Sequence, residues 1–172
     1  MEVVLRRGDL AARPAGLVAI GIFEGERRLA GAAAAVDRAS GGLVSALLKS
    51  GDFQGRWLEA ALLHPAGRRT RRILVLGMGK AVSFTPHRAR QLSAVAARRA
   101  RELRARTLAT VAHGAGRGGL DPARAAQAVA EGAVLGHWRF TAYRTEPMPA
   151  PLARIEIMEH DARYDYAEEW LG

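Results

Sequence analysis

Two glycine-bearing segments are the strongest chemical signals in the sequence, because a glycine backbone can approach a phosphate group closely. Gly77-Met78-Gly79-Lys80 follows the apolar run at 73–76 and carries a lysine, a residue type that binds phosphates. The second segment lies between a predicted strand and a predicted helix and contains Gly114, Gly116, Gly118 and Gly119. Three of its glycines fit the spacing G-x-G-x-x-G, which can present backbone N–H groups to a phosphate. We therefore regard Gly77, Gly79, Lys80 and the second glycine cluster as candidate ligand-binding residues.

Each glycine segment also has a simpler structural interpretation. The first lacks the four-residue spacer and the hydroxyl residue of a P-loop, and a tight exit from a buried strand needs the same glycines. The second has no acidic residue about 20 positions further on at the end of another strand, as a dinucleotide site would require. Asp121 would also repel an anion there. A flexible connecting loop is the alternative to a ligand-binding one.

The positive charge of the chain is concentrated in one segment. The net charge is +9, and residues 68–106 hold 12 basic residues against one acidic residue. Such a segment can bind a polyanion, and the candidate nucleic-acid contacts are Arg68, Arg69, Arg71, Arg72, Arg90, Arg101 and Arg104. The alternative is compositional: only Lys49 and Lys80 are lysines, and an excess of Arg, Ala and Gly is typical of a GC-rich genome.

No catalytic, metal-binding or cofactor-binding residues can be identified from the sequence. The chain has no cysteine, its five histidines lie at least 23 positions apart, and no nucleophile-elbow motif is present. No apolar run approaches the roughly 18 residues of a membrane span, and the N-terminus lacks a signal-peptide pattern. We therefore expect a soluble, cytoplasmic protein that makes no membrane contact.

Alternating strand and helix patterns predict a three-layer α/β/α sandwich around a mixed, mainly parallel sheet. The expected strands are 2–6, 17–23, 57–64, 71–76, 107–112 and 152–159, and the expected helices are 29–37, 42–49, 86–106 and 121–138. On the helix 86–106, Arg90, Arg101 and Arg104 fall opposite the apolar stripe. The helix 121–138 carries a face of small residues, which would let a neighbouring element approach its backbone closely.

The chain resembles the N-terminal domain of leucyl aminopeptidases. The resemblance is carried by I-L-V-L-G-M-G-K at 73–80, by Phe84-Thr85-Pro86, and by the segment 125–140, which is similar to the family's A-x-A-x-A-E-G-x-x-L-G-x-Y-R-F helix. It implies a macro-domain-like α/β fold without catalytic residues, because the metal ligands of the family lie in a larger C-terminal domain. Its implied partners are a second copy of the chain or a leucyl-aminopeptidase catalytic domain.

These resemblances divide the chain into an N-terminal-like domain at 1–160 and an acidic, aromatic tail at 161–172. The tail would serve as a docking segment through Tyr164, Tyr166, Trp170 and Leu171. The functional expectation is a non-catalytic domain for assembly, docking or regulation. Two alternatives stay open: a macro-like module that binds ADP-ribose or another phosphate-bearing ligand, and a nucleic-acid-binding protein that uses the arginine-rich segment 68–106.

Overall fold

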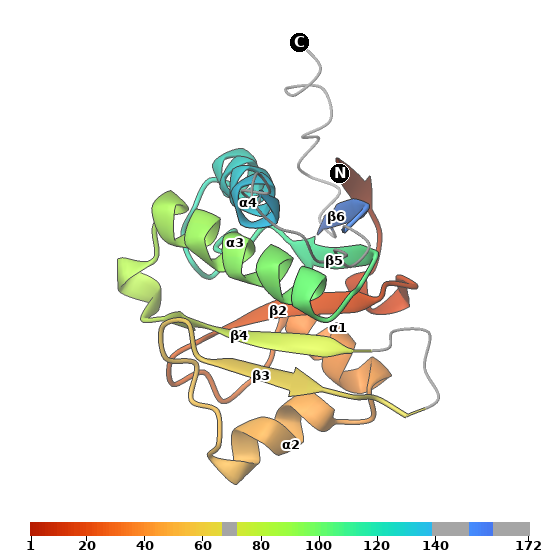
Figure 1. The fold of residues 1–172 in the computed structure, drawn as a ribbon. Helices are drawn as coiled ribbons and strands as arrows, with labels where there is room; N and C mark the ends of the chain where they lie inside the picture. The colour runs from red at the N-terminus through yellow and green to blue at the C-terminus, as the bar shows by residue number, and fades with distance from the viewer. Residues whose placement is uncertain (67–71, 139–151, 160–172) are drawn as a thin grey trace.

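The computed structural model describes residues 1–66, 72–138 and 152–159 (Figure 1). Its strands are β1 (Glu2–Arg7), β2 (Leu17–Phe23), β3 (Ala60–Leu63), β4 (Ile73–Gly79), β5 (Thr107–Val111) and β6 (Arg154–Glu159). Its helices are α1 (Gly31–Ala39), α2 (Leu43–Ser50), α3 (Pro86–Glu102) and α4 (Pro122–His137), with 3₁₀ turns η1 (Leu10–Ala12) and η2 (Ala81–Ser83). Within the part of the chain so described, no helix is long and apolar enough to cross a membrane.

The strands form one sheet in the order β1-β6-β5-β2-β4-β3. Strands β1, β6, β5, β2 and β4 pair in parallel, and β3 pairs antiparallel to β4 at the edge. The predicted mixed, mainly parallel sheet is therefore confirmed.

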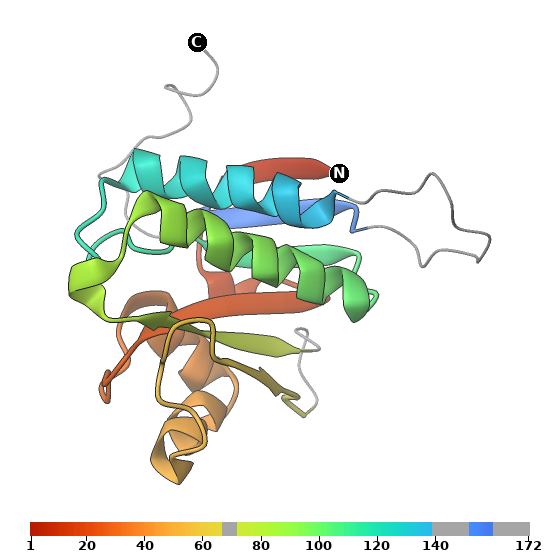
Figure 2. The same ribbon diagram turned by 60° about the vertical axis from the view of Figure 1, so that its left-hand side comes forward.

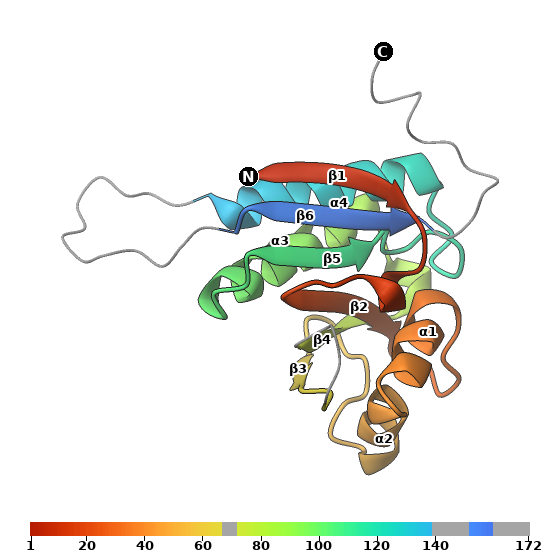
Figure 3. The same ribbon diagram turned by 90° about the vertical axis from the view of Figure 1, so that its right-hand side faces the viewer.

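The two faces of β2 belong to two different hydrophobic cores. Leu17 and Ala19 pack into the core under α3 and α4, whereas Val18, Ile20 and Ile22 pack into the core under α1 and α2. Successive strand residues point to opposite faces of a sheet, so a strand covered on both sides must be apolar throughout. Figure 3 shows the two helix pairs on opposite sides of the sheet, which confirms the three layers.

Helices α3 and α4 lie side by side with their backbones in close approach (Figure 2). A Cβ added at Gly132 would stand 2.0 Å from the Arg90 carbonyl oxygen, and one at Gly136 would stand 2.3 Å from that of Ala94. The buried Ser93 hydroxyl donates to the Val129 carbonyl across the same contact, at 2.6 Å. The small-residue face of α4 therefore permits the close packing that the sequence predicts.

Helix α3 ends four residues earlier than the sequence pattern suggests. The N–H of Ala105 donates to the Ala100 carbonyl at 2.8 Å, and the N–H of Arg104 donates to that of Arg101 at 2.9 Å. This is a Schellman cap, whose left-handed position is usually glycine. Arg104 occupies that position here with φ of 55°, so the sequence contains no glycine to mark the end of the helix. Arg104 therefore lies outside the helix whose face it was expected to share.

Strand β4 continues through the first glycine segment, for which the sequence pattern predicts a turn after the strand. Ile73–Gly79 is one buried strand, and Gly77 pairs with Ile22 while Gly79 pairs with Phe23 of β2. A Cβ at Gly77 would stand 1.8 Å from the Arg56 carbonyl oxygen. Glycine is required there because the loop before β3 crosses directly over the strand.

Candidate functional site

Strands β2 and β5 separate toward their carboxyl ends and open a cleft between them. Their register comprises two residue pairs, Leu17 with Leu108 and Val18 with Ala109, at the start of each strand. The next parallel strand after β2 in the chain is β4, on one side of it, and the next after β5 is β6, on the other side of the cleft (Figure 1). Such a switch point in an open parallel sheet is a usual place for a ligand crevice.

The cleft has a volume of about 280 Å³ and is lined mainly by apolar or small residues. Its lining residues are Ile20, Gly21, Phe23, Glu26, Ala30, Gly31, Ala32, Ala33, Met78, Val111, Ala112, His113, Gly114, Ala115, Gly116 and Arg117. The second glycine segment thus forms one wall. The floor is narrowed by Met78, whose sulfur lies 2.4 Å from the position that a Cβ of Gly21 would take.

His113 is a buried polar side chain in this cleft, 3% exposed. Its Nε2 lies 2.9 Å from Oγ1 of Thr110, and the Thr110 hydroxyl donates to the Ala19 carbonyl at 3.0 Å. Because that hydroxyl has a single hydrogen and a carbonyl can only accept, Nε2 of His113 must donate to Thr110. Burial lowers the pKa of His113 to about 4, so the ring is neutral near pH 7. Nδ1 is consequently a hydrogen-bond acceptor.

His113 lines the cleft close to Gly21 of β2. Nδ1 lies 3.1 Å from the position that a Cβ of Gly21 would take, and the Met78 sulfur lies 2.4 Å from the same position, so His113 and Met78 both pack over Gly21. Among residues 1–66, 72–138 and 152–159, His113 makes its hydrogen bond to Thr110 and none through Nδ1.

An ion pair crosses the mouth of the cleft. Arg117 Nη1 lies 2.5 Å from Oε1 of Glu26, and Oε2 of Glu26 accepts the N–H of Phe23 at 3.2 Å. The Glu26 side chain is 14% exposed, whereas Arg117 is 61% exposed. The backbone N–H groups of Arg117 and Gly118 have no acceptor in the part of the chain that is described. The mouth therefore holds a cation that is paired with a carboxylate, whereas Gly118 and Gly119 are absent from the cleft lining.

The first glycine segment is not part of this wall. The Gly77 N–H donates to the Glu59 carbonyl at 2.7 Å, and the Gly79 N–H donates to the Gly55 carbonyl at 2.9 Å. Both amides are thus used within the protein, and Gly79 also lies beneath Trp57, over which the Arg88 guanidinium stacks at 4.8 Å. Lys80 is exposed at the end of β4. The structure brings Gly114 and Gly116 to the cleft, and Gly77, Gly79 and Lys80 are absent from its lining.

Three of the candidate nucleic-acid arginines contact the protein itself. Arg90 pairs with Glu131 of α4 through Nε at 2.7 Å and Nη2 at 2.5 Å. Arg101 donates to the carbonyls of Gly136 and His137, and Arg72 donates to that of Leu103. Helix α4 therefore covers the face of α3 that carries Arg90 and Arg101.

The remaining sequence candidates are placed as follows. Arg104 is exposed. Arg68, Arg69, Arg71 and the tail residues Tyr164, Tyr166, Trp170 and Leu171 lie outside the described residues.

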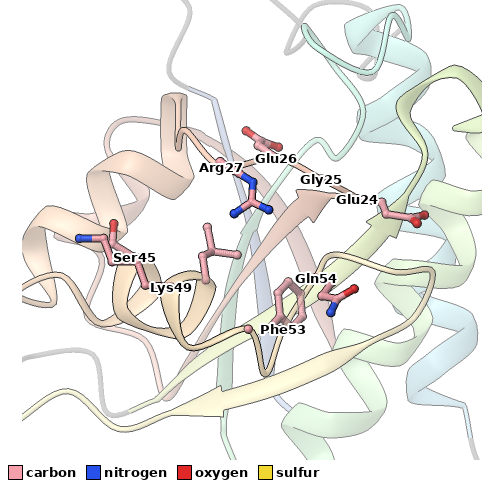
Figure 4. Close-up of a pocket in the computed structure, with 10 residues that line it drawn as sticks. Glu24, Gly25, Glu26, Arg27, Ser45, Lys49, Phe53 and Gln54 are labelled. Atoms are coloured by element: carbon pink, nitrogen blue, oxygen red, sulfur yellow. The ribbon is translucent and has the colours of Figure 1, made fainter.

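A second pocket, of about 460 Å³, lies beside the first and shares Glu26 with it. Figure 4 shows Arg27 pointing between α2 and the loop that carries Phe53, while Glu24 points away. The Ser45 hydroxyl and amide on its wall are already bound to Asp37, at 2.5 and 2.8 Å. The charged side chains of Arg27 and Lys49 in this pocket are exposed to solvent. Among the described residues that line the pocket, no buried polar side-chain atom lacks a hydrogen-bond partner.

Sequence reasoning missed His113, Thr110, Glu26 and Arg117 as residues of one site. His113 directly precedes the second glycine segment, so its place between a strand and a glycine loop was an available signal. Glu26 lies 91 residues from Arg117 in the chain, and no local pattern connects the two. Within the described ranges, no three His, Cys, Asp or Glu side chains gather to hold a metal ion.

The arrangement of the sheet, the two helix pairs and the cleft defines a protein of the macrodomain-like α/β class. A Trypanosoma brucei macrodomain, solved in complex with ADP, superposes with a TM-score of 0.75 at 16% identity. That match covers 99% of this chain and 69% of the macrodomain chain. At this level of identity, the similarity establishes the fold.

The chain belongs to the cytosol aminopeptidase family, whose N-terminal domain model matches residues 19–147. A probable cytosol aminopeptidase of Alkaliphilus metalliredigens is 32% identical over 130 residues, which are 75% of this chain and 26% of that protein. A mutant tomato leucine aminopeptidase superposes with a TM-score of 0.76 at 25% identity, over 92% of this chain and 32% of its own. The chain thus spans about a quarter to a third of the length of these relatives.

Proposed function

We propose that this chain is a non-catalytic docking domain of a cytosolic, metal-dependent leucyl aminopeptidase, and that it positions the catalytic portion during assembly. Membership of the N-terminal domain family supports this proposal, as does the share of its relatives that the chain spans. Two thirds or more of each relative lies outside the matched region, and the reactive groups of the enzyme belong there.

The observation that carries the proposal is an apolar patch at the end of α4, formed by Val134, Leu135 and Trp138. Their exposed fractions are 51%, 63% and 69%. Residues three and four positions apart lie on the same side of a helix, so these side chains form one surface. Exposed clusters of this kind mark protein interaction sites. The occupant we assign to this patch is the catalytic portion of the parent enzyme.

A chimera tests the assignment. Residues 1–172 of this chain replace the matched N-terminal region of the Alkaliphilus metalliredigens relative, and sedimentation velocity and leucine p-nitroanilide hydrolysis with Mn²⁺ are measured. We expect an assembled, active chimera, and we expect the double variant Leu135→Ser, Trp138→Ser to shift it toward dissociated protein. Val82→Ser is the matched control, because Val82 is a 96% exposed apolar residue in η2.

Two results would contradict the proposal. One is a double variant that assembles as well as the unmodified chimera. The other is hydrolysis of leucine p-nitroanilide by the isolated 172-residue chain, which would place reactive groups within it. If instead the isolated chain self-associates and the double variant no longer does so, a second copy of the chain occupies the apolar patch rather than the catalytic portion.

A further inference from the structure

Strand β1 forms one edge of the sheet, and the docking role assigned to α4 does not use it. The N–H of Glu2 donates to the Ala153 carbonyl at 2.9 Å, so the even-numbered residues of β1 direct their backbone groups toward β6. The backbone N–H and carbonyl groups of Val3 and Leu5 therefore point to the free edge of the sheet (Figure 3). In the described part of the chain, no strand pairs with that edge.

The side chains at this edge are incompletely covered. Val3 and Leu5 lie on the side of the sheet that faces α3 and α4, where both are only half-buried against the hydrophobic core. Glu2, Val4 and Arg6 lie on the opposite side, because successive strand residues alternate between the two faces. Glu2 and Arg6 are exposed, and Val4 is half-buried. A further strand beside β1 would cover aliphatic side chains on both faces of the sheet.

The sequence of β1 is complementary to itself in one antiparallel register. With Val4 opposite Val4 of a second copy, Val3 lies opposite Leu5, and Glu2 lies opposite Arg6. This register makes Val3 and Leu5 a hydrogen-bonded pair, as the direction of their backbone groups requires. Registers centred on Val3 or Leu5 do not bring Glu2 opposite Arg6, and a register centred on Arg6 places two like charges face to face, which is destabilising.

The charges in this register extend ion pairs that the chain already contains. Nε of Arg154 lies 2.8 Å from Oε2 of Glu2, and Nε of Arg6 lies 3.2 Å from Oε1 of the buried Glu156. Across the edge, Glu2 of one copy meets Arg6 of the other, so the two ion pairs join into one row of charges that alternate in sign. Ion pairs at a protein surface contribute most when several charges form a network.

We propose that β1 pairs antiparallel with β1 of a second copy of this chain, with Val4 on the two-fold axis, so that the sheets of the two copies join into one continuous sheet. Pairing satisfies the edge N–H and carbonyl groups of Val3 and Leu5 and covers their side chains. This surface is separate from the apolar patch at the end of α4, so the loss of one contact does not imply the loss of the other.

A single cysteine on the axis tests the register, because the chain has no cysteine of its own. In a non-hydrogen-bonded antiparallel pair the two Cα atoms lie about 4.5 Å apart, within the roughly 4.4–6.8 Å that a disulfide spans. We expect Val4→Cys to form a disulfide-linked dimer at least about tenfold faster than Ser50→Cys under mild oxidation, because pairing raises the local thiol concentration. Ser50, at the end of α2, is the more exposed position and reports random collisions. Equal rates overturn the proposal.

Charge variants test the ion pairs across the axis. Sedimentation velocity of the isolated chain should show a dimer, and Glu2→Arg should weaken it at least about tenfold, since like charges then face each other at both ends of the interface. Arg6→Glu should weaken it similarly, and an equimolar mixture of the two variants should recover the dimer, because opposite charges then meet. Glu24→Arg, the same reversal at an exposed residue after β2, is the control and leaves the dimer unchanged.

Three results of these measurements overturn the proposal. The first is a monomeric unmodified chain, and the second is a Glu2→Arg variant that dimerises as tightly as Glu24→Arg. The third is loss of the dimer in the double variant Leu135→Ser, Trp138→Ser, which would place the contact on α4 instead. The Val4→Cys measurement leaves every charge in place, so it does not depend on the folding of the charge variants.

Discussion

Thr110 determines which nitrogen of His113 carries the proton. Oγ1 of Thr110 lies 2.9 Å from Nε2 of His113 and 3.0 Å from the Ala19 carbonyl oxygen. The hydroxyl thereby bridges the strands β2 and β5 just beyond their last register pair, at the point where the cleft opens. The same residue holds the two strands together and sets the chemistry of the cleft.

The buried His113 predicts a loss of stability in mild acid. Burial lowers its folded-state pKa from 6.5 to about 4, so the unfolded chain binds the proton more readily as the pH falls. The contribution of the neutral ring to the free energy of unfolding is fully present above pH 6.5. It is lost progressively down to about pH 4, a total of about 3 kcal/mol. Urea unfolding between pH 7 and pH 4.5 measures this dependence. His113→Phe should show a shallower slope than the unmodified chain between pH 6.5 and 5, and equal slopes would contradict the assignment.

Thr110→Val should destabilise the domain although the two side chains are similar in shape. The substitution leaves the Ala19 carbonyl and the Nε2 hydrogen of His113 without their shared partner, which costs about 1–3 kcal/mol. Chemical denaturation of both proteins at pH 7 gives the difference. Thr107→Val is the comparison at the start of the same strand, where the hydroxyl accepts the Gly16 N–H at 2.9 Å in a half-buried position. If Thr110→Val lowers the free energy of unfolding no more than Thr107→Val does, the hydroxyl bridge between Ala19 and His113 contributes little to stability.

Gly132→Ala should destabilise the domain, even though alanine favours helix formation. The new Cβ would stand 2.0 Å from the Arg90 carbonyl oxygen, so α3 and α4 must move apart. Overpacking of this kind costs about 1–3 kcal/mol, which exceeds the gain of about 1 kcal/mol from helix propensity. Thermal unfolding measures the net effect. Gln127→Ala, on the exposed face of the same helix, should change the unfolding free energy by less than about 0.5 kcal/mol. A Gly132→Ala variant as stable as the parent would show that the two helices can separate freely.

Arg90 should act on stability rather than on nucleic-acid affinity. Its hydrogen bonds to Glu131 lower the pKa of that carboxyl, and the pair is partly exposed, so Arg90→Ala should cost less than about 1 kcal/mol at pH 7. The contribution of this ion pair to the free energy of unfolding is present above the pKa of Glu131 in the unfolded chain. It disappears as the pH falls and the carboxyl group becomes protonated.

Anisotropy titrations with a duplex oligonucleotide test the other role of Arg90. The affinities of the parent and of Arg90→Ala should be equal at each salt concentration. A reduced affinity in the variant, with a smaller dependence on salt, would instead support the nucleic-acid interpretation of the arginine-rich segment.

The local sequence was sufficient to predict the layers of the fold and most of its elements. Unbroken apolar residues in β2 indicate a strand covered on both faces, Thr85 and Pro86 mark the start of α3, and the glycines of α4 indicate a close neighbour. These features are set by residues near one another in the chain, through periodicity, capping and side-chain size. The end of α3 was missed because an arginine takes the left-handed position in which glycine is usual.

The cleft was decided by the tertiary structure. The sequence offers two glycine segments as candidates, each with a structural alternative. In the folded chain the amides of Gly77 and Gly79 bind the loop before β3, whereas Gly114 and Gly116 lie at the opening between β2 and β5. Glu26 and Arg117 come from loops 91 residues apart. The pKa of His113 depends on its burial, and its ring shares the space over Gly21 with the Met78 side chain. Such properties arise from contacts between distant segments, because a pKa or an open volume belongs to the packed surroundings of a residue rather than to its type.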